Sequence, residues 1–154
     1  MLRSDEPLPG GRFTPTHYRA VHRHLFHDVY AWAGRYRTVR ISKGASTFCY
    51  PEHIPAQMRR LFARLAGMNR LRGRSADDFA AGAADFLSEL NAIHAFREGN
   101  GRTQLAFMTE LAAEAGHPLD LTRLEPGPFL RAMIASFQGS EADLTAQLRA
   151  MIDR

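Results

Sequence analysis

The stretch "HAFREGNGRTQL", residues 94–105, interrupts a regular helical pattern and decides how the chain folds around it. Apolar residues recur at helical spacing before it, as far as Ile93, and again after Asn100. The pattern predicts two helices joined by a short turn, with the "GNG" sequence directly ahead of the second helix. The first N–H groups of a helix have no partners within it and lie at the positive end of its dipole, so this turn is suited to bind an anion.

The polar residues of this turn are the types that phosphoryl or nucleotidyl transfer requires. The loop Gly99–Gly101 lets a phosphate approach the backbone, and Arg102 is a favourable residue in a first helical turn only beside an anion. Glu98 offers a carboxylate of the kind that holds Mg²⁺ next to phosphates. His94 titrates near neutral pH and suits the general base that deprotonates an attacking hydroxyl. Phe96 between them is expected to anchor the turn in the core.

Each of these residues also has an ordinary structural interpretation. His94 could interact with the dipole at the end of a helix, Glu98 could be a solvated turn residue, and "GNG" could be a plain loop. Their co-occurrence in one short segment favours the catalytic interpretation, because positioning and charge neutralisation supply most of the catalysis in such transfers.

Outside this stretch the chain is predicted to be mostly helical, which makes the fold class all-α. Pro15 after Thr14 and the acids after Ser75 mark helix starts, and Gly116 with Pro118 marks a stop. The helices expected besides the one that follows Asn100 cover about 14–31, 54–67, 75–93, 126–137 and 140–152.

One segment departs from helical spacing. Residues 34–42, "GRYRTVRIS", alternate bulky and polar side chains, "KGAS" supplies turn residues, and "TFCYP" restores strand-forming residues until Pro51. The pattern predicts a small β-hairpin near residues 35–50. A hairpin without a larger sheet leaves strand edges unpaired, so it either accepts an extended peptide or is a covered connector.

Four histidines lie in the first predicted helix: His17, His22, His24 and His27. One helix cannot direct all four at a single ion, and no carboxylate-rich partner segment is evident. We therefore expect these side chains to pack at the surface or at the edge of the core.

The composition sets the broad class. The 154 residues, 45% hydrophobic and 23% charged, predict one soluble domain over residues 14–154 after a Pro- and Gly-rich arm, residues 1–13. Cys49 is the only cysteine, and no signal peptide or membrane-spanning run is recognised, so cytoplasmic localisation without a membrane partner is expected. The net charge of +4 comes from scattered arginines without interleaved aromatic residues, so nucleic-acid binding is disfavoured. The oligomeric state is not indicated.

The segment "HAFREGNGR" at residues 94–102 closely resembles the signature of the Fic family: histidine, any residue, phenylalanine, any residue, an acid, then GNGR. The sequences "HRHLFHDVYAWAGRYRTVRISKG" (residues 22–44) and "FCYPEHI" (residues 48–54) also resemble the family's helix and target-docking flap. The resemblance covers roughly residues 14–120. It implies the Fic fold, a helical bundle with a hairpin flap.

The resemblance implies a protein adenylyltransferase that moves AMP from ATP, with Mg²⁺, onto a Ser, Thr or Tyr hydroxyl of a target protein. It assigns the general base to His94, the Mg²⁺ ligand to Glu98 and the contact with the β-phosphate to Arg102. The nucleotide-binding loop is Gly99, Asn100 and Gly101. The flap that aligns the target by strand addition is Ile41, Ser42, Lys43, Gly44, Ala45, Ser46, Thr47 and Phe48.

Two positions depart from the family pattern. Ala95 replaces a common proline, which mainly restores backbone freedom. Leu105 stands where the family has a second arginine, which grips the γ-phosphate. Losing such a contact weakens ATP placement by ~1.5–3 kcal/mol unless another group replaces it. Leu105 could instead join an apolar stripe with Met108 and Leu111.

The departures leave three alternatives: a weak AMP transferase, an enzyme for another nucleotide, or a degenerate Fic domain that binds a nucleotide or partner without catalysis. The family's inhibitory helix is not recognised in this sequence. A separate small antitoxin is therefore a further partner that the resemblance leaves open, although Leu105 removes the arginine that the usual inhibitory glutamate captures.

Overall fold

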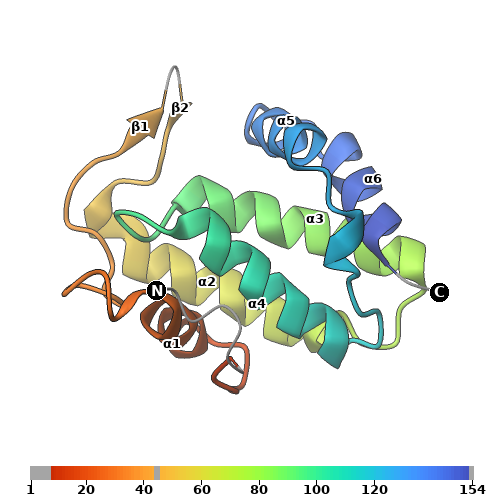
Figure 1. The fold of residues 1–154 in the computed structure, drawn as a ribbon, viewed down its shortest axis with the longest axis horizontal. Helices are drawn as coiled ribbons and strands as arrows, with labels where there is room; N and C mark the ends of the chain where they lie inside the picture. The colour runs from red at the N-terminus through yellow and green to blue at the C-terminus, as the bar shows by residue number, and fades with distance from the viewer. Residues whose placement is uncertain (1–7, 44–45, 153–154) are drawn as a thin grey trace.

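The computed structural model describes residues 8–43 and 46–152. It confirms an all-α bundle with a small hairpin (Figure 1). The helices are α1 Pro15–Phe26, α2 Ile54–Gly67, α3 Ala76–Ile93, α4 Asn100–Glu114, α5 Pro126–Phe137 and α6 Ala142–Met151, and the strands are β1 Ser42–Lys43 and β2 Ser46–Thr47. Short 3₁₀ turns cover Pro51–His53, Asn69–Leu71 and Leu121–Arg123.

Helix α3 is the centre of the bundle. It packs against α2 and α4 on one side and against α5 and α6 on the other (Figure 1). Its buried residues, Phe79, Ala80, Ala83, Ala84, Phe86, Leu87, Leu90 and Ile93 among them, therefore occupy several faces rather than one stripe. Since α3 is held on both sides, its C-terminal end provides a rigid base for the turn that follows.

The predicted helix starts are confirmed by their caps. The Thr14 hydroxyl accepts the backbone N–H of His17, and the Ser75 hydroxyl accepts that of Asp78. In each case a side chain satisfies an N–H that the helix leaves without an internal partner. Helices α2 and α5 have the bounds that the sequence predicted, and α6 begins two residues later and ends one residue earlier than predicted.

The prediction that the first helix continues to about residue 31 was wrong, because α1 ends at Phe26. The chain then turns, and Val29, expected on the apolar stripe, is 49% exposed. The turn brings the N–H of Gly34 to Nδ1 of His22, at 2.9 Å. A helix running to residue 31 would carry Gly34 away from this acceptor.

The predicted hairpin exists but its strands are short. Ser42 pairs with Thr47 and Lys43 with Ser46 in antiparallel register, and the hairpin projects beyond the end of α3 (Figure 1). The hairpin predicted near residues 35–50 has its paired residues within 42–47, because the residues before it bond to the bundle instead: the N–H of Arg37 donates to the carbonyl of Ala95 at 2.9 Å. Gly44 and Ala45 lie outside the described residues.

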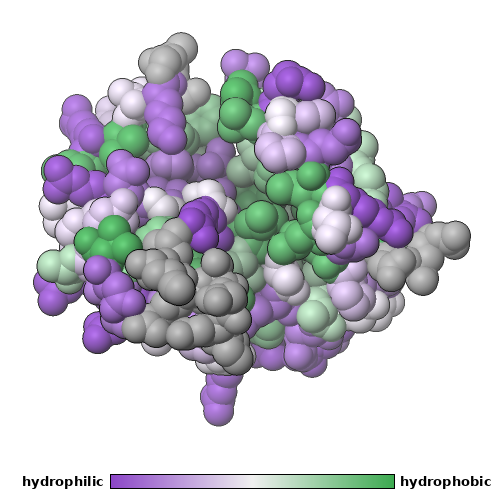
Figure 2. Space-filling model, viewed as in Figure 1, coloured by the Kyte–Doolittle hydropathy of each residue, from purple (hydrophilic) through white to green (hydrophobic). Residues whose placement is uncertain are grey.

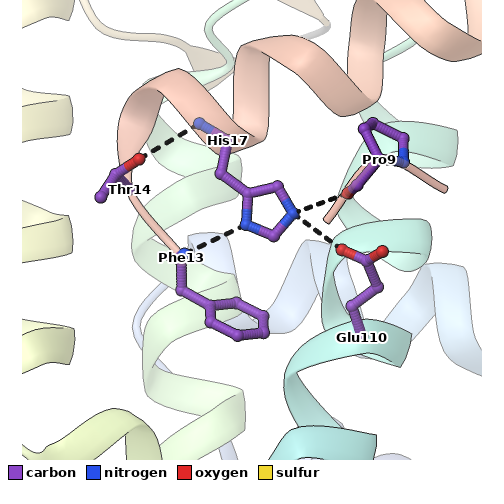
Figure 3. Close-up of polar contacts among 5 residues, drawn as sticks. All are labelled: Pro9, Phe13, Thr14, His17 and Glu110. Carbon is purple, nitrogen blue, oxygen red and sulfur yellow. Dashed lines mark hydrogen bonds and ion pairs between the residues drawn. The ribbon is translucent and has the colours of Figure 1, made fainter. Parts of the chain in front are cut away.

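A histidine fastens the described part of the N-terminal arm to the bundle (Figure 3). His17 is 5% exposed, and its Nδ1 accepts the N–H of Phe13 at 3.0 Å. Its Nε2 lies 2.9 Å from a carboxylate oxygen of Glu110 on α4 and 3.0 Å from the carbonyl of Pro9. Both ring nitrogens are thus occupied, and His17 joins the arm, α1 and α4.

The prediction of one domain that begins at residue 14 stays a prediction.

The surface is mixed in character. Hydrophobic side chains gather on the face between α5 and α4 among many polar ones (Figure 2). The most exposed large apolar residues are Leu130 and Ile134 on α5, at 61% and 50%. Within the described residues, no helix has the length and apolar character needed to cross a membrane.

Candidate functional site

The turn between α3 and α4 is fixed by its own residues. His94 ends α3 in the left-handed conformation, with φ 51° and ψ 64°, and Gly99 precedes α4 with φ 82°. The Asn100 side chain is buried and clamps Phe96 from both directions: its oxygen accepts the N–H of Phe96 at 2.9 Å, and its amide donates to the carbonyl of Phe96 at 2.6 Å. Phe96 is fully buried, as predicted for an anchor.

His22 of α1 also supports the turn between α3 and α4. Its ring stacks on Phe96 with centroids 3.8 Å apart, and its Nε2–H donates to the carbonyl of Glu98 at 2.9 Å. Because Nδ1 accepts from Gly34, the ring is the neutral tautomer, and burial lowers its pKa. The prediction of a position at the surface or core edge was wrong for this histidine, which is completely buried.

A pocket of about 330 Å³ opens at this turn, beneath the flap. Of the predicted site residues, His94, Glu98, Gly99, Asn100 and Gly101 line it, together with Ile41, Ser42 and Lys43 of the flap. Its other lining residues are Val39 and Arg97. A Cβ atom added to Gly101 would meet nothing within 4 Å, so the backbone at the start of α4 is open to a ligand. The structure therefore brings the turn and the flap together around one space.

Among the predicted catalytic, metal-binding and nucleotide-binding residues, Arg102 is the one that does not line this pocket. It lies in the first turn of α4 and is exposed, whereas Arg97, on the turn itself, does line the pocket. Leu105, one turn further along α4, is half-buried, while Met108 and Leu111 are fully buried. Leu105 thus lies at the edge of the apolar stripe rather than within it.

His94 is buried to 8% exposure and lies flat against Phe48 of the flap, with ring centroids 3.9 Å apart and planes 10° apart. Its Nδ1 makes no hydrogen bond of good geometry with the described residues. Burial, and after it the charges of Lys43 and Arg37, lower the pKa of His94 to about 4, against the opposing effect of a hydrogen bond with the Asn91 backbone. At neutral pH the imidazole is therefore uncharged and able to accept a proton.

The flap residues divide between two roles. Ile41, Ser42 and Lys43 face the pocket, and Ser42–Lys43 with Ser46–Thr47 form the hairpin. Phe48 instead turns inward at 7% exposure, between His94 and Phe137 of α5, and its N–H donates to the carbonyl of Ile41. Phe48 therefore shapes the site and has no free N–H to pair with another strand.

The burial of Arg37 was not predicted from the sequence. This residue is 5% exposed, and its guanidinium donates to backbone carbonyls of Ile93, His94, Val39 and Cys49. Arg37 is one of the polar positions of the alternating segment, and an arginine three residues after a glycine carries no signal of burial. Only the chain's path around the end of α3 could have identified it.

The described residues contain no cluster of three or more His, Cys, Asp or Glu side chains suited to enclose a metal ion. Glu98 is an exposed carboxylate at the pocket, without an ion pair to another described residue. It could contribute one oxygen to a cation that is held mainly by a ligand. Lys43 and Arg97 give the pocket two cations against this single acid, which favours an anionic ligand.

Comparison with known proteins places these features in a family. The model of the Fic/DOC family matches residues 12–112. The chain is 55% identical over 151 residues to "Probable protein adenylyltransferase y4lH" of Sinorhizobium fredii, covering 97% of this chain and 79% of the relative. It is 40% identical to "Protein adenylyltransferase VbhT" of Bartonella schoenbuchensis, covering 90% of this chain but only 29% of that protein.

Solved structures agree. The BepC effector protein of Bartonella tribocorum, crystallised with bound AMPPNP, superposes with a TM-score of 0.86 at 26% identity, over 96% of this chain and 78% of that one. A Fic domain from Bartonella quintana with bound ADP also gives 0.86, at 28% identity, over 98% of this chain and 78% of that one. From its sequence match, its helical bundle with a hairpin flap, and these structural neighbours, the chain belongs to the Fic/DOC family.

Proposed function

We propose that this protein transfers AMP from ATP to a serine, threonine or tyrosine hydroxyl of a target protein. One observation carries the proposal: an uncharged His94 lines the same pocket as the open backbone at the start of α4. A phosphate bound at these N–H groups would lie beside the imidazole. Relatives named protein adenylyltransferases, and neighbours that hold AMPPNP or ADP, support the same reaction.

In this reaction His94 accepts the proton of the target hydroxyl as its oxygen attacks the α-phosphorus of ATP. The bond from the α-phosphorus to the bridging oxygen breaks, pyrophosphate leaves, and the hydroxyl oxygen becomes bonded to AMP. The low pKa of His94 keeps the base uncharged in the free protein. The negative charge of ATP offsets the positive charges of Lys43 and Arg37. We therefore expect nucleotide binding to raise the pKa of His94 towards the range that favours proton transfer.

Glu98 would hold Mg²⁺ together with the phosphates of ATP. The exposed carboxylate and the lack of a cage of acidic ligands among the described residues fit a cation of this kind, which binds through one or two carboxylates plus substrate oxygens. Bound there, Mg²⁺ would neutralise phosphate charge. Arg102 is proposed to contact the β-phosphate from the first turn of α4, and Arg97 adds positive charge at the pocket.

The flap would present the target. Its two short strands form one antiparallel pair, which leaves each strand with an outer edge among the described residues. An extended target segment that pairs with one of these edges would place a hydroxyl beside His94. Main-chain pairing of this kind gives affinity with little dependence on the target's side chains.

The proposal is tested with ATP labelled at the α-phosphate and Mg²⁺. We expect label on the protein itself or on proteins of a bacterial lysate, reduced roughly 10²–10⁴-fold in His94→Ala. Glu98→Gln keeps the size of the side chain but removes its charge, so it should raise the Mg²⁺ concentration needed for half-maximal transfer. Label that persists in His94→Ala would contradict the proposal.

One observation favours a second candidate, a domain that binds nucleotide without transfer: the family's second arginine is replaced by Leu105, and this side chain offers no contact to a phosphate. Calorimetric binding of ATP-Mg²⁺ without any transfer would identify this function. We expect Leu105→Arg to strengthen ATP use by roughly ten- to hundredfold, the effect of one charge-assisted contact. A separate antitoxin stays a prediction.

A further inference from the structure

Arg37 is a buried cation bonded to backbone carbonyls alone. Its Nε donates to the carbonyl of His94 at 2.7 Å and Nη1 to that of Val39 at 2.7 Å. Nη2 donates to the carbonyls of Cys49, at 2.5 Å, and Ile93, at 3.0 Å. No carboxylate among the described residues pairs with it, so the four carbonyl dipoles replace the water that the charge has lost.

These four carbonyls belong to three separate segments. Ile93 and His94 form the end of α3, where carbonyls have no helical partner and the helix dipole favours a cation. Val39 and Cys49 lie on the two sides of the flap. A single planar guanidinium therefore joins the end of α3 to both legs of the hairpin.

The backbone of Arg37 strengthens this junction. Its N–H donates to the carbonyl of Ala95, and the N–H of Cys49 donates to that of Ala92. The junction fixes Cys49, and Phe48, the adjacent residue, lies with its ring on the imidazole of His94. Arg37 thus holds the backbone of His94 on one side and the support for the covering ring on the other.

This arrangement matters because the His94 ring has little else to orient it. The Asn91 backbone acts on the ring, as its effect on the pKa shows, but Nδ1 makes no hydrogen bond of good geometry to a described residue, whereas many catalytic histidines are oriented by such a bond. The backbone of His94 is also in the left-handed region, which is unfavourable for a side chain that branches beyond Cβ and needs support from its surroundings. The position of the imidazole depends on the carbonyl contact and on the Phe48 stack.

We propose that Arg37 is a positioning residue for the transfer reaction: by joining the end of α3 to the two legs of the flap, it sets the imidazole of His94 against Phe48 and towards the bound nucleotide. This inference rests on the proposed function. It assigns to Arg37 no contact with substrate; the residue acts through His94 and Phe48.

Two substitutions separate the geometry from the charge. Arg37→Lys keeps a positive charge but cannot reach four carbonyls with one ammonium group. Arg37→Gln removes both the charge and the planar fork. Arg35→Gln is the matched control, because Arg35 is an exposed arginine of the same segment. All variants are first checked for folding by circular dichroism and thermal melting.

The rate of label transfer is the first readout. We expect both Arg37 variants to lose roughly ten- to hundredfold in rate at saturating ATP, the size of effect that a small misplacement of a catalytic group produces. The KM for ATP should change far less, because Arg37 does not line the pocket. Arg35→Gln should retain the wild-type rate. A folded Arg37→Lys protein that transfers label at the wild-type rate would overturn the inference. This test holds even if Arg37→Gln does not fold.

The second readout is independent of activity: the pKa of His94 and the contact between the rings of His94 and Phe48, both measured by NMR. The charged groups around the imidazole are Arg37, Lys43 on the flap, and Arg97 and Glu98 at the pocket. Arg37→Gln should raise the pKa of His94, and Arg37→Lys should weaken the ring contact while the pKa stays low. Both properties unchanged in both variants would refute the positioning role.

The two readouts distinguish this inference from the proposed function. A wild-type protein that transfers no label would end the adenylyl-transfer proposal, yet the NMR measurements would still decide whether Arg37 sets the position of His94. A wild-type protein that transfers label, with Arg37 variants equal to it in both readouts, would end only the inference.

Discussion

The interior of α1 and the turn at the end of α3 both contain buried histidines, but they use them differently. In α1, His17 and His22 have both ring nitrogens within hydrogen-bond distance of partners. At the turn, the Nδ1 of His94 makes no hydrogen bond of good geometry among the described residues, and the ring stacks on Phe48. A histidine that is fully bonded contributes to stability, while one that is buried and incompletely bonded remains available for chemistry.

The same contrast applies to the two glycines of the turn. Gly99 has φ 82°, and a Cβ there would lie 2.5 Å from the ring of Phe26. Gly101 has open space in the direction of a Cβ. One glycine is required by the fold, and the other is required only if a ligand approaches. Substitutions at these histidines and glycines separate residues that the fold requires from residues that the reaction requires.

The largest effect is expected for His22→Ala. It leaves the N–H of Gly34 and the carbonyl of Glu98 without partners and removes the stack on Phe96, so the free energy of unfolding should fall by about 3–5 kcal/mol. Urea denaturation measures this loss. His27→Ala, at an exposed histidine of the same segment, should change stability by less than about 0.5 kcal/mol. Equal losses of unfolding free energy in His22→Ala and His27→Ala would contradict a structural role specific to His22.

Gly99→Ala should destabilise the folded protein, whereas Gly101→Ala should stabilise it. The first forces a side chain into the left-handed region and against Phe26, which costs about 2–4 kcal/mol. The second adds a helix-forming residue in open space and should stabilise the protein by about 0.5–1 kcal/mol, while its methyl group weakens ATP binding roughly tenfold. Thermal melting and calorimetry with ATP-Mg²⁺ measure the two quantities. Unchanged ATP affinity in Gly101→Ala would contradict a phosphate site there.

His94 should reduce stability in acid. Its pKa in the folded protein is lowered to about 4, so the unfolded chain binds a proton first as the pH falls below about 6.5. Stability is therefore fully present above pH ~6.5 and is lost as the pH falls towards 4, by on the order of 1–2 kcal/mol at pH ~5. His94→Gln should lose less stability than the wild type between pH ~7 and ~5. Identical losses would show that His94 is solvated like an unfolded histidine.

The smallest effect is expected for Glu110→Gln. Burial raises the pKa of Glu110, and the contact with His17 opposes this shift. The raised pKa means that ionised Glu110 costs stability as the pH rises through its titration range. The glutamine keeps an acceptor for His17 without a desolvated charge, so it should stabilise the protein at pH ~7 by no more than about 1 kcal/mol, and by less at pH ~4. Clear destabilisation at pH ~7 would mean that the ion pair outweighs the cost of burial.

Local signals in the sequence predicted much of the fold. Thr14 and Ser75 cap helices as expected, and apolar spacing located α2 and α5 at their observed bounds. The signals failed where partners from elsewhere in the chain intervened. Val29 fits a helical stripe, but the bond from Gly34 to His22 needs the chain to turn before it. The residues around Arg37 alternate like a strand, but their hydrogen bonds go to the end of α3.

The candidate site shows the same division. The segment from His94 to Gly101 was recognisable because its residues are adjacent and their chemistry fits one reaction. The roles of Asn100 as a clamp, of Phe48 as a cover for His94 and of His22 as a support for Glu98 were not recognisable. These roles are defined by residues at different distances along the chain, and one sequence does not specify which of them meet.

The sequence by itself determined the helices, the turn at residues 94–99 and the family to which the chain belongs. These follow from spacing, capping and neighbouring residue types, which are local properties. Only the tertiary structure decided that Arg37 is buried, that Phe48 covers the imidazole, and that Arg102 lies outside the pocket lined by Arg97. The physical reason is that burial, hydrogen-bond partners and pKa depend on which distant segments displace water from a residue.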